Sequence, residues 1–147
     1  MRSVEERTET LQSLLRGELS AVETYRQALE KVGDEPGAVD VRRIERDHQE
    51  AADTLRMHIV QRGGQPADSS GAWGSWAQLV TGMAKLFGDT ATLKALKEGE
   101  EHGLKEYEEA LEDENLDPEC KVLIRNTLIP RQREHIRVLD RLLGARS

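Results

Sequence analysis

Five acidic or imidazole side chains occupy positions where helical periodicity predicts apolar residues. Each lies in a stripe of apolar residues spaced three and four apart: Glu18, Glu45, His48, Glu100 and His135. Burying an unpaired ionised carboxylate is costly, so buried carboxylates are paired, protonated or bound to a metal. No Lys or Arg shares these stripes near the glutamates, which leaves the two histidines as partners. Carboxylate and imidazole together suit iron, manganese and, less selectively, zinc.

Two of the stripes repeat one spacing. Glu45 and His48 are three residues apart, and so are Gln132 and His135, so each pair leaves one face of its helix. One Glu from each of two helices, with Glu-x-x-His from each of the other two, is the ligand set of a carboxylate-bridged dimetal centre. The chain matches that set except at Gln132, where an amide replaces the second Glu of the motif.

Four amphipathic helices are needed to position these groups. The periodicity predicts one helix over about residues 4–32, a second that ends near Gln61, a third that begins after Gly88-Asp89-Thr90, and a fourth that begins at Asp117-Pro118. Pro130 lies inside the fourth helix and should kink it, because proline removes a backbone hydrogen bond and crowds the preceding turn.

A long crossover joins the two halves of the chain. Residues 66–75 are predicted to form a loop, and Trp76 to Phe87 a short amphipathic helix. Trp73, Trp76 and Phe87 are predicted to pack as a lid against the bundle, with a dimer contact as the alternative.

The sequence contains an internal duplication. When residues 8–30 are shifted by 82, ten of the twenty-three positions meet an identical residue, including Glu18 with Glu100 and Tyr25 with Tyr107. The second and fourth helices match at an offset of 87, which pairs His48 with His135. We therefore expect an all-α fold, a four-helix bundle of two duplicated helical hairpins joined by a long crossover that contains a short helix. It forms one domain over residues 1–147, with repeat 1 at about 4–62, the crossover at about 63–89 and repeat 2 at about 90–145.

Composition excludes several classes of partner. A formal charge of −7 disfavours binding to nucleic acid or to an anionic membrane. No apolar run is long enough to span a membrane, and the N-terminus lacks the apolar core of a secretory signal. Cys120, as the single cysteine, rules out an internal disulfide and is predicted to be a structural thiol. We expect a cytoplasmic protein whose partners are metal ions, with a homodimer or higher oligomer as a further possibility.

The motifs resemble the ferritin-like superfamily. The segment Arg16-Gly-Glu-Leu-Ser-Ala-Val-Glu-Thr-Tyr25 is similar to the first ferroxidase helix, and Glu45-Arg-Asp-His48 and Gln132-Arg-Glu-His135 are similar to the metal-binding second and fourth helices. More narrowly, the whole chain resembles an uncharacterised bacterial ferritin-like family, a domain of unknown function.

The resemblance implies a metal site and a reaction. It implies two iron ions, with manganese or zinc as alternatives, and an oxidation of iron linked to O₂ or peroxide. The implied ligands are Glu18, Glu45, His48, Glu100 and His135, with Glu45 or Glu100 bridging.

The resemblance also implies roles for Tyr25, Tyr107 and Gln132. The resemblance implies that both tyrosines donate hydrogen bonds to carboxylates across the site. Because Gln132 removes one negative charge and one bridging ligand, we expect one strong and one weak metal position, the weak one on the Gln132 side, and a mononuclear or mixed-metal site becomes plausible.

One alternative stays open at this point. The same residues could form a metal-free buried Glu/His/Tyr network in a helical stress or interaction protein without turnover. The sequence does not decide whether the chain is an enzyme. His58 and His102 have no counterparts in the repeat and are predicted to be solvated.

Overall fold

The computed structural model describes residues 3–32, 37–68 and 89–145. Within these ranges all regular secondary structure is helical, and there is no strand. The helical elements are α1 (Val4–Val32), α2 (Ala38–Gln61), α4 (Asp89–Ala110), α5 (Pro118–Leu123), the π-helical turn η2 (Ile124–Leu128) and α6 (Ile129–Ala145). The short helix predicted for Trp76 to Phe87, with the aromatic side chains of the crossover, lies outside the described residues.

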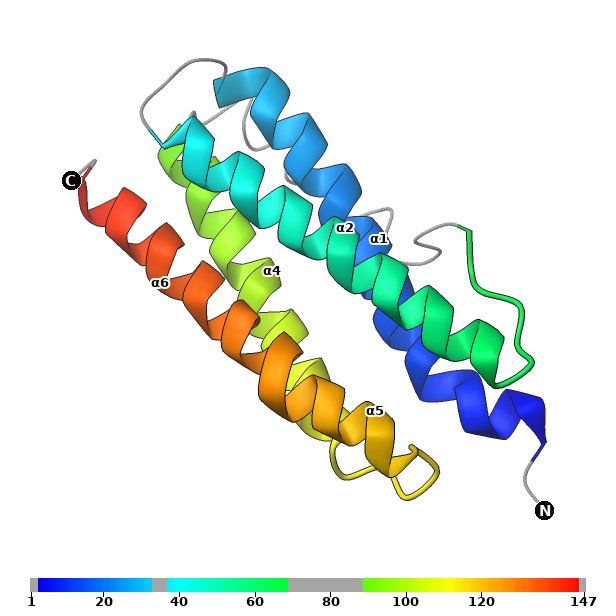
Figure 1. Cartoon of the computed structure of the whole chain (residues 1–147). Coiled ribbons are helices and arrows are strands. Elements are labelled where there is room, and N and C mark those ends of the chain that lie inside the picture. Colours follow the sequence, from blue (N-terminus) through cyan, green and yellow to red (C-terminus); the bar gives the residue numbers. More distant parts are fainter. Residues whose placement is uncertain (1–2, 33–36, 69–88, 146–147) are drawn as a thin grey trace.

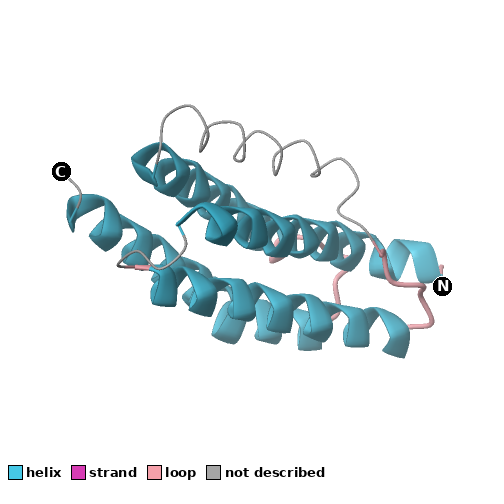
Figure 2. Cartoon of the chain, turned by 90° about the horizontal axis from the view of Figure 1, so that it is seen from above, coloured by secondary structure: helices cyan, strands magenta, loops and turns pink. Residues whose placement is uncertain are grey.

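The helices form a bundle of two hairpins. α1 packs along α2, and α4 packs along the long fourth helix made by α5, η2 and α6 (Figure 1). The two pairs lie against each other, with α1 beside α4 and α2 beside α6. The view from above shows two layers, one of α1 with α4 and one of α2 with α6 (Figure 2). The expected helical bundle is therefore confirmed for the described residues, and the duplication remains a prediction from the sequence.

The apolar core is divided along the bundle axis. One cluster of buried side chains includes Leu15, Leu55 and Ile124, and a second includes Ile44 and Leu139. On every long helix the polar stripe residues fall between the two clusters in sequence, as His48 does between Ile44 and Leu55. The bundle thus has apolar packing on both sides of a polar layer.

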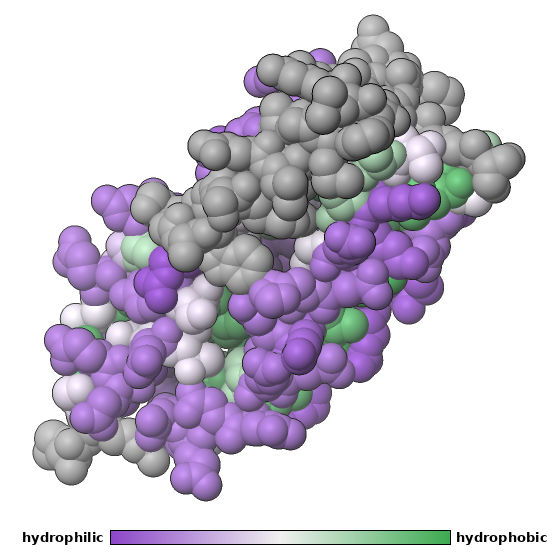
Figure 3. All heavy atoms as spheres, turned by 180° about the vertical axis from the view of Figure 1, so that it is seen from behind, coloured by the Kyte–Doolittle hydropathy of each residue, from purple (hydrophilic) through white to green (hydrophobic). Residues whose placement is uncertain are grey.

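The outer surface follows the amphipathic pattern. Over the described residues of the face in Figure 3, hydrophilic side chains cover the helices and apolar side chains show between them. Among these residues, no helix combines the length and apolarity that crossing a membrane requires.

Pro130 is accommodated by a widened turn. The amide of Ile129 donates to the carbonyl of Ile124, five residues earlier, so the helix makes a π turn immediately before the proline. Proline has no amide hydrogen to donate and crowds the turn before it, and a π turn is one way in which a helix absorbs such a local conflict. The kink predicted at Pro130 stays a prediction, and the structure shows a π turn over Ile124–Leu128, which ends four residues before Gln132.

The prediction that His58 is solvated is wrong. Its side chain is buried, its Nδ1 lies 3.2 Å from Nη1 of Arg62, and the buried thiol of Cys120 is 3.8 Å away. Arg62 also binds Asp117, with 2.5 Å between Nε and Oδ2. Periodicity does not detect this arrangement, because it depends on α5 folding back over the end of α2.

Gly37 offers a test of the first hairpin. Its φ of 98° lies in the left-handed region, and a Cβ there would come within 2.9 Å of Leu142 Cδ2. We expect Gly37→Ala to lower the free energy of unfolding by about 1–2 kcal/mol, measured by urea denaturation followed by circular dichroism. Gly144→Ala is the matched control, because a Cβ at this helical position would meet nothing within 4 Å. Equal stability of the two variants would contradict the strain at Gly37.

Candidate metal centre

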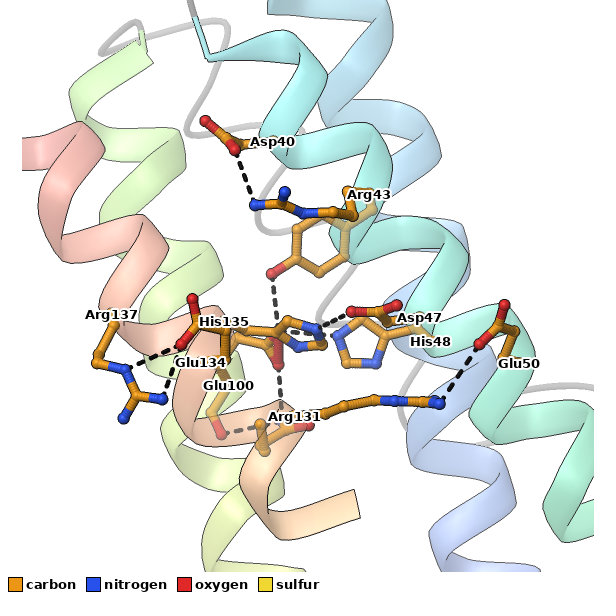
Figure 4. A network of polar contacts seen from close by, with 12 residues as sticks. Asp40, Arg43, Asp47, His48, Glu50, Glu100, Arg131, Glu134, His135 and Arg137 are labelled. Atoms are coloured by element: carbon orange, nitrogen blue, oxygen red, sulfur yellow. Dashed lines mark hydrogen bonds and ion pairs between the residues drawn. The ribbon is translucent and has the colours of Figure 1, made fainter. Parts of the chain in front are cut away.

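Four ionisable side chains from four helices converge in the polar layer. α1 contributes Glu18, α2 His48, α4 Glu100 and α6 His135, and all four are buried. Along each helix, apolar side chains of the two core clusters lie before and after these groups, so their burial is imposed by the packing around them. Figure 4 shows His48, Glu100 and His135 gathered between their helices.

The two imidazoles alternate with carboxylates. His48 lies between Glu18, with 2.5 Å from Nδ1 to Oε2, and Glu100, with 2.8 Å from Nε2 to Oε1. Nδ1 of His135 lies 2.8 Å from the same Glu100 oxygen. Each hairpin therefore pairs its own glutamate with Nδ1 of its own histidine, and Glu100 also reaches the histidine of the other hairpin.

Two tyrosine hydroxyls donate hydrogen bonds to the two buried glutamates, each to the glutamate of the other hairpin. The Tyr107 hydroxyl donates to Glu18, and the Tyr25 hydroxyl donates to Oε1 of Glu100 at 3.1 Å. The Tyr25 ring also stacks on His48, with ring centroids 5.3 Å apart. The structure thus places both hydroxyls on the carboxylate of the opposite hairpin.

Gln132 binds Glu100 through its amide group. Its Nε2 donates to Oε2 of Glu100 at 2.7 Å and to the Glu100 carbonyl oxygen at 3.1 Å. Gly103 makes this approach possible, because a Cβ at that position would lie 2.5 Å from the amide nitrogen. Gln132 therefore binds Oε2 of Glu100, and Oε1 of Glu100 faces the two histidines.

Glu45 is not brought into this cluster. Its side chain is 16% exposed and pairs with Arg26, with 3.3 Å between Oε1 and Nε. At about 100° per residue, position 45 is turned about 60° from His48 around the helix axis, toward α1. The sequence-based expectation of a core position for Glu45 thus differs from the structure, which places it at the edge of the stripe.

Asp47 is a member of the cluster that the sequence analysis missed. Its Oδ2 lies 2.8 Å from Nε2 of His135, across the contact between α2 and α6 (Figure 4). Position 47 is about 100° from His48 on the side away from Glu45. The only signal for it in the sequence is an acidic residue directly before His48, and periodicity cannot tell that this side of α2 meets α6.

The electrostatics favour ionised groups. Burial alone would raise the pKa of Glu100, but the nearby imidazoles of His48 and His135 lower it to about 2. Burial alone would lower the pKa of His48, but Glu100 and Glu18 raise it well above 6.5. The pKa of His135 is likewise raised against burial, by Asp47 and Glu100. Burial and the neighbouring carboxylates raise the pKa of Tyr25 and of Tyr107 well above 10, so both hydroxyls remain donors.

Three of these residues could hold a metal ion. His48, Glu100 and His135 each offer one ligand atom, and the three atoms all lie within 4.8 Å of one another. Nδ1 of His135 is buried and makes no hydrogen bond, because the nearby Glu100 oxygen lies in the wrong direction for one. A buried imidazole nitrogen without a hydrogen bond, beside a second imidazole and a carboxylate, fits the donor set of a transition metal.

The metal-free cluster predicts a pH dependence of stability. Glu100, with its pKa lowered from 4.5 to about 2, stabilises the fold above pH 4.5, and this contribution is lost as the pH falls toward 2. His48, with its pKa raised above 6.5, stabilises the fold below pH 6.5, and this contribution is lost as the pH rises through the folded-state value. Both contributions are complete between about pH 4.5 and 6.5.

The measurement is urea denaturation of chelator-treated protein across this range. We expect the free energy of unfolding of the wild type to fall as the pH rises above 6.5, and that of His48→Gln to fall less. Equal slopes in the two proteins would show that His48 is neutral in the folded chain.

Comparison with known proteins supplies a family. No curated protein and no solved structure matches the chain. A family model described as "Domain of unknown function (DUF2383)" matches residues 6–113, which include Glu18, His48 and Glu100 and end before His135. This range is well over half of the chain, and the match confirms the expected domain of unknown function. The chain belongs to the DUF2383 family of domains of unknown function.

Proposed function

We propose that this protein binds transition metal ions in a dimetal centre of the ferritin-like kind, with iron as the metal. The single observation that carries the proposal is the buried cluster of His48, Glu100 and His135, whose ligand atoms lie within 4.8 Å of one another. The proposed domain spans residues 1–147, with the repeats at about 4–62 and 90–145 on either side of the crossover.

The arrangement of the donors supports two neighbouring positions. One would use Glu18 with Nδ1 of His48, which lie 2.5 Å apart, and the other Glu100 with Nδ1 of His135, which lie 2.8 Å apart. Asp47 on the far nitrogen of His135 would hold that ring in orientation, as outer carboxylates do for histidine ligands elsewhere. Each position then has one carboxylate and one imidazole from a single hairpin.

The two positions are not equivalent. The sequence pattern alone suggests weaker binding on the Gln132 side, but the geometry favours Glu100 as the anchor of the tighter position. Both histidines face its Oε1, and Gln132 holds its other oxygen. Glu45, which would complete the position at Glu18, is instead paired with Arg26. We therefore assign the stronger binding to the Glu100 position.

The surroundings suit redox chemistry at a buried metal. Bound iron would supply one-electron chemistry toward O₂ or peroxide. The chain would contribute the protonated hydroxyls of Tyr25 and Tyr107, which donate to the two carboxylates, and the apolar clusters that shield the layer from water on both sides.

The first test counts metal ions. Elemental analysis after anaerobic loading with Fe²⁺ should find close to two ions per chain, one bound much more tightly. Because both imidazoles hold protons in the metal-free protein, affinity should rise with pH. The variant His48→Ala/His135→Ala should lose both ions. A wild type that takes up no metal would refute the proposal.

A second test separates two positions from one. If Glu18 is a ligand, Glu18→Gln should remove one ion per chain and leave the tighter one. If Glu18 only orients His48, the count should not change. Gln132→Glu should tighten the ion at the Glu100 position, because it places a second carboxylate beside Glu100. Glu134→Gln is the matched control, since Glu134 is exposed and pairs with Arg137. Unchanged binding in Gln132→Glu would show that position 132 does not contribute a ligand.

A metal-free role is the second candidate. It is favoured by the alternation of Glu18, Glu100 and Asp47 with two protonated imidazoles, which neutralises most of the buried charge without an ion. In that case thermal stability should be the same with a chelator and with added Fe²⁺, whereas a ligand bound only by the folded state raises it.

A further inference from the structure

A small cavity adjoins the metal cluster between α1 and α4. Its volume is about 40 Å³, and Glu18 and Glu100 form part of its wall. Gly17, Gly99 and Gly103 line it as well, so at these positions only backbone borders the space. A cavity of this size has room for water-sized species beside the two carboxylates.

A second hollow lies beside this space along the same two helices. Its volume is about 320 Å³, and it is lined on its acidic side by Glu9, Glu106, Glu109 and Asp113. Leu14 and Glu106 line both spaces, so the two meet at these side chains. Glu9 and Glu109 are exposed, which brings the outer end of the hollow to the surface formed by the described residues.

The second hollow forms a groove between α1 and α4, and its charge differs from that of the hollow between α1 and α2. The hollow between α1 and α2 has a volume of about 670 Å³ and is lined by Arg26, Arg42 and Arg46, with Glu30 and Glu45. Its lining is of mixed charge with one more positive than negative side chain, whereas a cleft with one negative sign raises the local concentration of cations and their rate of association. Of these two hollows, the groove between α1 and α4 is therefore the one that suits the entry of a positively charged ion.

The geometry points to the groove between α1 and α4 as the path by which a divalent cation reaches the buried centre, with Glu106 as the carboxylate at its neck. This inference rests on the proposed function, because it requires a cation site at the inner end. Glu106 is partly exposed and pairs with His102 at 3.3 Å on its outer side. On its inner side a Cβ at Gly17 would lie 3.6 Å from its Oε2, so a larger side chain at 17 would narrow the neck.

The test measures the rate at which Co²⁺ alone binds to the full chain. Chelator-stripped protein is mixed with excess Co²⁺ in a stopped-flow instrument, and the visible absorption of the bound ion gives the rate and the final amplitude. Glu106→Gln should slow binding about fivefold and weaken its dependence on ionic strength, with the final amplitude unchanged. Gly17→Leu, once circular dichroism shows that it is folded, should slow binding at every ionic strength.

Two controls isolate the carboxylate. Glu101→Gln removes the same charge from an exposed position on the opposite side of α4 and should bind at the wild-type rate. His102→Gln removes the ion-pair partner of Glu106 but leaves the negative charge of Glu106 in place, so Co²⁺ binding should not slow.

The outcomes separate the two proposals. Wild-type rates in both Glu106→Gln and Gly17→Leu would overturn the path and leave the metal centre standing. A final amplitude that falls as much as the rate in Glu106→Gln would make Glu106 a ligand and also overturn the path. A wild type that binds no Co²⁺ would overturn the metal centre and the path together.

Discussion

The burial of Glu18 and Glu100 is the constraint on which the rest of this structure depends. A carboxylate in an apolar bundle must be compensated, and here each one accepts hydrogen bonds from a tyrosine and a histidine. Those donors lie on α1, α2 and α4, and Gln132 on α6 also donates to Glu100, so the compensation joins all four helices at one level. The apolar clusters on either side hold the helices at the distance that these contacts require. Stability and site geometry are therefore coupled through the same few side chains.

The same constraint explains why the two halves of the site differ. Two carboxylates placed side by side without a cation repel each other, so a third beside Glu18 is unfavourable, and Glu45 pairs with Arg26 instead. Gln132 meets no such repulsion, because its amide donates to Glu100. Gly103 allows this contact, because the absence of a side chain at position 103 leaves room for the amide of Gln132.

The polar layer is asymmetric in its access as well. The groove between α1 and α4 carries the carboxylates that lead from the surface to the cavity, while arginines line the hollow beside α2. Glycines line the inner space where larger side chains would fill it. Around a buried cation site, such an arrangement sets the charge of what can enter, independently of which ion finally binds.

The sequence by itself determined four amphipathic helices and the inward direction of Glu18, His48, Glu100 and His135. Periodicity suffices for this, because a helical residue's direction follows from its position in the stripe. Only the tertiary structure decided which neighbour each side chain meets. Asp47 and Glu45 flank the same stripe, yet one meets His135 and the other Arg26, and His58 became buried only where α5 covers it. These outcomes depend on the rotation and spacing of helices relative to one another, which the pattern within a single helix does not contain.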